Sequence, residues 1–230
     1  MIKHIKIVLI IGCCMGMSTS LKAQNYRADL IKVYEKLNKS AFKLEVQMKM
    51  NHWNALTPSK TLKGVVMRKA NNYYTNLAGR VTLQNPFYTI MITEKDKNIF
   101  YMPTKKSNKN VSQKEALTMM NDTSMFKNIK LIYADATGNT YEMIKPTLGM
   151  KKMQVKISNT NVLKEVRYYY EKSEETPIKE VVISYSKLVF NPSFNTNDFS
   201  EKKYFKKING KETLTAAYKD YKLSYAGNYR

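Results

Sequence analysis

A strict alternation of apolar and polar side chains most constrains the fold of this chain of 230 residues. Between positions 42 and 50 every second residue is apolar, and the residues between them carry a charge or an amide. Successive side chains of a β-strand point to opposite faces of a sheet, so the pattern predicts a strand with one apolar and one solvated face. The apolar members are Phe42, Leu44, Val46, Met48 and Met50.

Shorter runs of the same kind follow, separated by turn-forming residues. They predict strands at 61–68, 73–77, 81–84, 87–93, 99–102, 129–134, 140–144, 153–157, 162–170 and 178–190, with a further candidate at 203–208. A helix is expected before them, because Tyr26, Leu30, Val33, Tyr34 and Leu37 recur at helical spacing. A second helix is expected to interrupt the strands from Ser112 to Asn121, where Ser112 and Glu115 form a capping box.

This order of elements predicts a mainly β protein of the α+β class. About ten antiparallel strands in one sheet must curl, because strands twist with a fixed hand. We therefore expect one large curled antiparallel sheet that forms a half-open barrel, with the N-terminal helix and the inserted helix covering its concave face. No linker-like stretch divides the chain, so residues 25–230 are expected to form a single domain with a C-terminal extension at about 204–230.

The first 24 residues have the layout of a secretory signal peptide. A basic start, Met1 to Lys6, precedes an uncharged apolar run from Ile7 to Met17. That run is too short to cross a bilayer, which needs about 20 residues. We expect cleavage near Ala23 or Gln24, which would leave the chain in the periplasm or cell envelope. The alternative is a lipid anchor on Cys13.

Cleavage would remove both cysteines and leave His52 as the only histidine. Lys3, Lys6 and Lys22 would leave as well, so the formal net charge of +21 would fall by three. Nucleophilic catalysis usually needs a histidine or an activated cysteine, and the sequence has no metal-ligand cluster, P-loop or dinucleotide fingerprint. A lone His52 beside Trp53 is more typical of a surface residue. We expect no enzyme, no cofactor and no metal, and a hydrolase with two distant carboxylates remains the weakest hypothesis.

In the order of its elements the chain resembles the LolA/LolB-type envelope lipoprotein carriers. The resemblance spans residues 28–199. It rests on the export signal, the helix ending at Leu37-Asn38, and the stretches FKLEVQM at 42–48, KGVVMR at 63–68, NYYT at 72–75 and IFYMP at 99–103. It implies a shallow apolar cup that holds acyl chains of a lipid or lipoprotein and performs no chemistry on them. The chain departs from the family in its longer C-terminus and its far more basic composition.

The residues expected to line this cup follow from alternation within strands and from the inserted helix. They are Phe42, Leu44, Val46, Met48, Val66, Ile90, Leu117 and Met120. Methionines are frequent in the first two-thirds of the chain, where they either fill an ordinary core or form an adaptable lining for varied acyl chains. A fully packed core would show the same alternation, so both interpretations stay open.

The basic charge indicates a second kind of partner. Lysines recur at 105, 106, 109, 151, 152, 202, 203, 206 and 207. They either form an ordinary solvated surface or attract an anionic membrane or envelope polysaccharide. Nucleic acid is not expected, because no helix-turn-helix, zinc or RNP pattern is present. The sequence therefore predicts an exported, non-catalytic binder or carrier of lipid or lipoprotein acyl chains. The alternative is an envelope interaction module that binds a protein or anionic partner through its basic surface.

Overall fold

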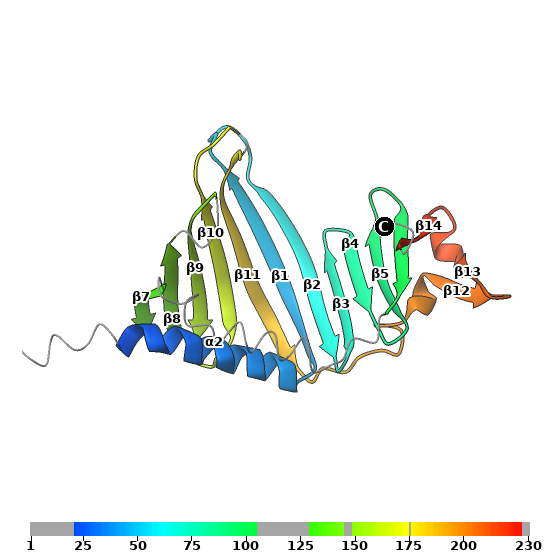
Figure 1. The fold of residues 1–230 in the computed structure, drawn as a ribbon, viewed down its shortest axis with the longest axis horizontal. Helices are drawn as coiled ribbons and strands as arrows, with labels where there is room; N and C mark the ends of the chain where they lie inside the picture. Colours follow the sequence, from blue (N-terminus) through cyan, green and yellow to red (C-terminus); the bar gives the residue numbers. More distant parts are fainter. Residues whose placement is uncertain (1–20, 105–128, 145–148, 175, 227–230) are drawn as a thin grey trace, which may run out of the picture.

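The computed structural model describes residues 21–104, 129–144, 149–174 and 176–226, which form one α-helix, a 12-stranded sheet and a separate two-stranded sheet (Figure 1). The helix is α2 (Leu21–Lys39), and the first half of the large sheet consists of β1 (Phe42–His52), β2 (Lys60–Lys69), β3 (Asn72–Leu77), β4 (Arg80–Gln84), β5 (Tyr88–Thr93) and β6 (Asn98–Pro103). The second half consists of β7 (Ile129–Asp135), β8 (Gly138–Ile144), β9 (Met150–Ser158), β10 (Leu163–Tyr170) and β11 (Ile178–Phe190). The C-terminal segment adds the short helices η2 (Glu201–Lys203) and η3 (Ala216–Tyr218), the hairpin β12 (Phe205–Ile208) and β13 (Lys211–Leu214), and the edge strand β14 (Lys222–Tyr225).

Two antiparallel meanders, β1–β6 and β7–β11, make up most of the sheet. They join where β11 pairs with β1, with Phe42 opposite Phe190. The sheet runs from β14 at one edge to β7 at the other, so it is open and not a closed barrel. The predicted mainly β fold with one large sheet and an N-terminal helix is confirmed, whereas the inserted helix at 112–121 lies outside the described residues.

The edge strand β14 differs from the expected pattern. It pairs in parallel with β6, with Lys222 opposite Asn98. The sequence predicts only antiparallel neighbours and does not predict a strand at 222–225. A parallel neighbour is possible here because the chain between β6 and β14 is long and includes the second meander and the β12–β13 hairpin.

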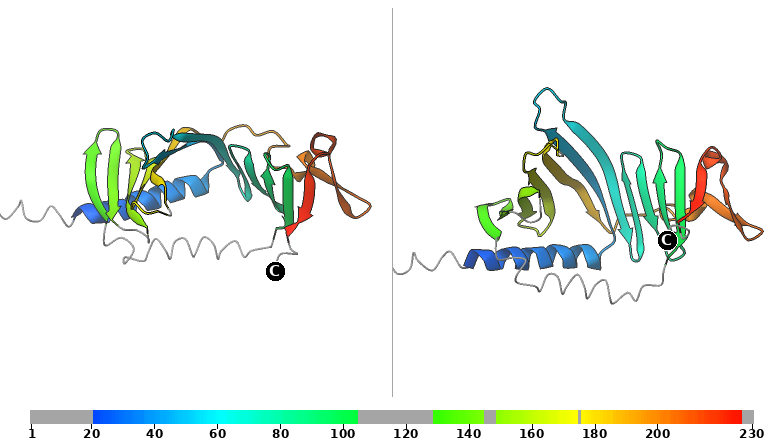
Figure 2. Two further views of the ribbon diagram at one scale, coloured as in Figure 1. Left: turned by 90° about the horizontal axis from the view of Figure 1, so that it is seen from above. Right: turned by 45° about the horizontal axis from the view of Figure 1, so that its top comes forward.

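The sheet bends around α2, which lies on the inside of the bend (Figure 2). The face on this side is called the concave face, and on β1 it carries Phe42, Leu44, Val46, Met48 and Met50. Residues directly opposite one another in paired strands share a face, so the strand registers assign every other strand position to the concave or the convex face.

The concave face is packed by α2 over the second meander. Tyr26 and Val33 of the helix are buried against Tyr141, Val155 and Val166 from β8, β9 and β10. Tyr141 lies edge-on to Tyr26, with ring centroids 4.9 Å apart. Its hydroxyl donates a hydrogen bond of 2.7 Å to Asp29 of the helix. This half of the concave face is therefore a closed core.

The convex face is packed by the C-terminal segment over the first meander. Tyr204 and Phe205, each 1% exposed, are buried against Leu83, Ile90 and Ile99. The registers connect Ile90 through Leu83, Tyr74 and Met67 to Lys43 of β1, which lies on the opposite face from its neighbours Phe42 and Leu44. This core therefore lies on the opposite face from the one that α2 covers. The two halves of one sheet thus bury opposite faces. No helix among the described residues is both long and apolar enough to span a bilayer.

Candidate functional site

An apolar patch occupies the middle of the concave face, next to the core that α2 closes. On β1 and β2 the register places Leu44 opposite Val66, and Met48 opposite Leu62. On the other side of β1, Val46 lies opposite Tyr185 and Met48 opposite Ile183 of β11. The concave patch consists of Val46, Met48, Met50, Leu62, Val66, Ile183 and Tyr185.

The concave patch is half-buried and not closed. Each of its side chains has intermediate exposure, whereas Phe42 and Leu44, on the same face near the end of α2, are 5% and 8% exposed. Within the described residues, the core partners of α2 come from β7–β11 and not from β2–β6. Apolar side chains also reach solvent further along this face, since Tyr73 is 38% and Met91 is 42% exposed.

The end of α2 is fixed beside the concave patch by Arg68 of β2. Its guanidinium donates hydrogen bonds to the carbonyl of Leu37, at 3.2 Å, and to the side chain of Asn38. A cation near a helix C-terminus satisfies carbonyls that lack an intrahelical partner and favours the helix dipole. The helix is therefore held at the border of the concave patch.

Two tyrosines bring polar atoms to the apolar surface. Burial raises the pKa of Tyr185, and the neighbouring Tyr168 and Tyr73 add smaller contributions. Burial likewise raises the pKa of Tyr73. Tyr73 and Tyr185 come from β3 and β11, which β1 and β2 separate in the sheet. The phenols remain neutral at physiological pH and can donate hydrogen bonds to a bound polar group.

Five of the predicted cup residues, Phe42, Leu44, Val46, Met48 and Val66, do share the concave face. Ile90 does not: it is fully buried in the convex core beneath Phe205, so its selection for the same surface as β1 was wrong. Leu117 and Met120 lie outside the described residues.

The sequence interpretation missed the contribution of β11 to this surface. Ile183 and Tyr185 alternate with serines at 184 and 186, a pattern that marks a strand with one apolar face. The pattern alone could not show that β11 pairs with β1, because the two strands are far apart in the sequence. Leu62 and Met50 could have been selected as cup residues from the alternation of apolar and polar side chains within β2 and β1.

The convex face of the second meander is polar and internally bonded. Glu142 accepts hydrogen bonds from Lys152, at 3.0 Å, and from Gln154, at 2.8 Å. Arg167 forms ion pairs with Glu165, at 3.0 Å, and Glu180, at 3.3 Å. Charges paired in this way along β8–β11 are typical of a solvated surface.

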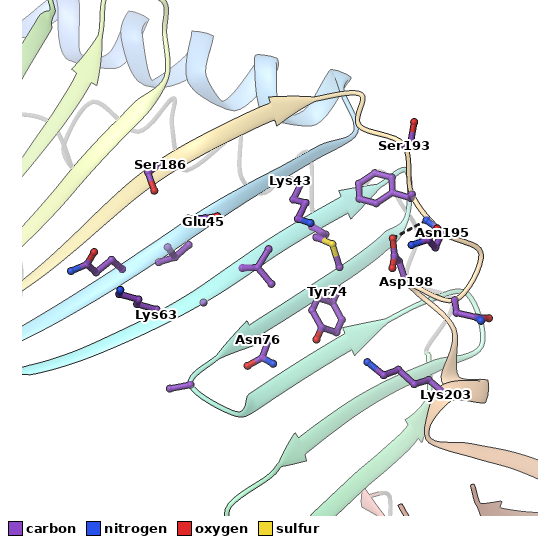
Figure 3. Close-up of a pocket in the computed structure, with 18 of the residues that line it drawn as sticks. Lys43, Glu45, Lys63, Tyr74, Asn76, Ser186, Ser193, Asn195, Asp198 and Lys203 are labelled. Atoms are coloured by element: carbon purple, nitrogen blue, oxygen red, sulfur yellow. Dashed lines mark hydrogen bonds between the residues drawn. The ribbon is translucent and has the colours of Figure 1, made fainter. Parts of the chain in front are cut away.

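A polar groove of about 1290 Å³ lies on the convex face of β1–β3 (Figure 3). Its floor includes Lys43 and Lys63, and the loop after β11 forms one wall, where the backbone N–H of Asn195 donates to Asp198 at 2.9 Å. Within the described part of the chain, Lys43, Lys63 and Lys203 form no ion pair. The lining also includes Glu45, which pairs with Lys187 at 3.0 Å, and Asp198, so the three lysines of the groove outnumber its two carboxylates.

His52 ends β1, where it pairs with Ile178, and it is half-buried. The described residues contain no group of three or more His, Cys, Asp or Glu side chains placed to hold a metal ion. Neither observation defines a reacting centre in the part of the chain that the structure covers.

No family model and no curated protein matches this chain. Among solved structures, an uncharacterised conserved protein from Thermus thermophilus matches with a TM-score of 0.46 and 8% identity, over 76% of this chain and 92% of that one. A LolA superfamily protein from Nitrosomonas europaea matches with a TM-score of 0.34 and 10% identity, over 79% and 98%. LprF from Mycobacterium bovis matches with a TM-score of 0.38 and 10% identity, over 78% and 99%.

The chain thus resembles a LolA superfamily protein among others, as its sequence predicts.

Proposed function

We propose that this protein is an exported, non-catalytic carrier that holds an acyl chain of a lipid or lipoprotein against the concave patch. The observation that supports the proposal is the uneven packing of one continuous concave face. α2 closes the part formed by β7–β10, while the described residues leave Met48 on β1, Val66 on β2 and Ile183 on β11 half-buried. An acyl chain is the ligand that suits such a surface, because it is long, flexible and apolar.

The energetics favour an acyl chain over a polar ligand. Each methylene removed from water contributes about 0.8 kcal/mol, so about ten methylenes buried against the patch supply about 8 kcal/mol, which is of the order of the cost of association. Methionines suit a ligand of variable length, because their side chains are unbranched and polarisable. Tyr73 and Tyr185 have raised pKa values because of burial, and in the proposed complex their neutral hydroxyls would donate to a carbonyl or headgroup at the end of the chain.

A photoreactive fatty acid tests this proposal. The purified chain is irradiated with the probe, and labelled peptides are identified by mass spectrometry. We expect labels in 42–50 and 60–68, reduced by an excess of unlabelled fatty acid. Labels confined to β4–β6, which carry the convex core, would refute the acyl-chain proposal. Labels that the competitor does not reduce would refute it as well.

A second candidate function is binding of an anionic envelope polysaccharide in the polar groove. The three lysines without an ion pair, Lys43, Lys63 and Lys203, favour it. Retention of the chain on an acidic polysaccharide column should weaken with salt, and the double change K43E/K63E should weaken it further. Lys95→Glu, in the turn between β5 and β6, is the matched control. If K95E weakens retention as much as K43E/K63E, the groove has no special role.

A further inference from the structure

An aromatic pocket of about 590 Å³ lies on the convex face at the far end of the first meander, away from the concave patch and the polar groove. It is formed by the ends of β5 and β6 and by the C-terminal segment, including β14. Its lining residues are Pro86, Phe87, Tyr88, Tyr101, Pro103, Glu201, Lys202, Lys207, Glu212 and Tyr225.

Aromatic rings line this pocket from three strands. The rings of Tyr88 and Tyr101 lie 6.2 Å apart at 64°, and Tyr225 of β14 lies 5.6 Å from Tyr101. Phe205 packs beneath them, 5.3 Å from Tyr88 and 5.2 Å from Tyr101. Because Phe205 is 1% exposed, it fixes the positions of the tyrosines above it. Phe87 and Tyr225, in contrast, are 67% and 42% exposed, so aromatic surface faces solvent at the pocket's mouth.

Carboxylates occupy the same pocket. Glu212 accepts hydrogen bonds from the hydroxyls of Tyr88 and Tyr101, each at 3.2 Å, through its two separate oxygens. A carboxylate has about four acceptor positions, so these two bonds orient Glu212 and leave acceptor capacity free. Glu201 accepts a hydrogen bond of 2.7 Å from the side chain of Asn85.

The two carboxylates of the pocket have no ion-pair partner among the described residues. Neither Glu201 nor Glu212 forms an ion pair within these residues, in a chain where lysines and arginines outnumber acidic residues 39 to 18. Both carboxylates are half-buried, while Lys202 and Lys207 of the same pocket are exposed. The negative charge therefore lies inside the pocket and the positive charge at its mouth.

We propose that this pocket binds an organic ammonium group, such as the choline-type cation of a zwitterionic lipid headgroup or of a free amine. The faces of tyrosine rings attract cations, and the attraction strengthens when the cation is desolvated. Glu212 supplies the opposing charge, held by two hydroxyl groups before any ligand arrives. Lys202 and Lys207 are placed at the mouth, where a phosphate attached to the ammonium would lie.

The test is an NMR titration of the purified chain with choline and with 3,3-dimethylbutan-1-ol, the neutral molecule of the same shape. We expect choline to bind at least about tenfold more tightly, since only the cation gains from the rings and the carboxylate. Equal affinities would mean that the pocket recognises apolar shape alone, and the proposal would fail.

Two variants and a matched control locate the site. E212Q keeps the size of the side chain and should weaken choline binding at least about tenfold by removing its charge. Y225L removes a half-exposed ring at the sheet edge and should weaken binding about threefold. Y133L, which removes an exposed tyrosine from the opposite edge strand β7, should leave binding unchanged. An E212Q variant that is folded by circular dichroism and binds choline like the parent chain would overturn the assignment.

Phosphocholine distinguishes the two sources of the cation. If it binds more tightly than choline, and the double change K202A/K207A removes the gain, the ligand is a lipid headgroup. If it binds no more tightly than choline, the site serves a free ammonium compound.

Discussion

Gly64 of β2 shows how closely the first strands approach one another at the concave patch. It lies opposite Val46 on β1 and Leu77 on β3. A β-carbon added to Gly64 would stand 2.2 Å from the carbonyl oxygen of Asn76 and 2.9 Å from the α-carbon of Leu77. Both are backbone atoms of β3, which no side-chain rotation can move. Glycine is therefore required for the sheet to bend here.

We predict that Gly64→Ala lowers the free energy of unfolding by about 1–3 kcal/mol, as overpacking against backbone does elsewhere. Urea unfolding followed by circular dichroism measures the change. Thr61→Ala, at an exposed position of the same strand, is the control and should have a much smaller effect. Equal losses in the two variants would show that β3 can move away from a new side chain.

Ile90 illustrates where prediction from sequence succeeds and fails at the scale of a residue. Alternation within β1 correctly placed every second residue from Phe42 to Met48 on one face, because the side-chain period of a strand is two. Alternation says nothing about which face of the next strand continues that surface, since each turn resets the phase. In β5, Ile90 and Ile92 are apolar while the alternating Thr89 and Thr93 are polar, and this stripe faces the convex core.

At the scale of the element, α2 is held by a buried tyrosine and a carboxylate. Tyr141 of β8 donates to Asp29 at 2.7 Å, and Asn139 donates to the same carboxylate oxygen at 2.9 Å. Burial raises the pKa of Tyr26 to about 12, with a smaller contribution from Tyr168. Burial, followed by the hydrogen bond and charge of Asp29, also raises the pKa of Tyr141. The docking of α2 therefore requires both phenols to be neutral.

This predicts loss of stability at alkaline pH. A phenol with a raised pKa in the folded state stabilises fully below its unfolded pKa of about 10, and the contribution is lost as pH rises through the folded value. The free energy of unfolding should therefore be level from pH 8 to 10 and fall between pH 10 and 12, by up to about 1.4 kcal/mol per pH unit for each such group. Urea titrations at pH 8, 10 and 11.5 measure this.

Y141F separates this effect from general alkaline unfolding. At pH 8 it should cost about 1 kcal/mol through the lost hydrogen bond to Asp29, while its decline above pH 10 should be shallower than that of the parent chain. Identical declines would contradict the assignment of the alkaline sensitivity to α2 docking.

The elements themselves were largely predictable, and their partners were not. The helix at 26–37 and the strands from 42 to 190 were predicted from periodicity. Each of these elements buries one face, so its apolar residues recur at the spacing of a helix or of a strand. The strand β14 was missed because four residues, Lys222–Tyr225, are too few to show alternation. The convex core was missed because Tyr204 and Phe205 are about a hundred positions from the strands that they cover, and local patterns carry no information on such distances.

At the scale of the whole molecule, one sheet has two cores on opposite faces. α2 closes the concave face of the second meander, and the C-terminal segment closes the convex face of the first. The strands between them, β1, β2 and β11, connect the two cores. The concave patch lies on these strands, at the point where the sheet changes the face that it buries.

Two substitutions test the independence of these cores. Phe205→Ala should cost about 3–5 kcal/mol and speed amide hydrogen exchange in β4–β6 more than in β8–β10. Val155→Ala, in the α2 core, should have the reverse regional effect with a smaller loss of stability. Uniform acceleration across the sheet in both variants would show a single cooperative core.

The central claim, that the concave patch holds an acyl chain, is tested most directly by two neighbouring residues of β1. Met48 faces the concave patch, and Gln47 is exposed on the opposite face of the same strand. A fluorescent fatty acid is titrated into the parent chain and into Met48→Lys and Gln47→Lys, which add the same charge. The account predicts that M48K weakens binding at least about tenfold while Q47K leaves it unchanged. Equal binding by a folded M48K variant, or equal weakening by Q47K, would contradict it.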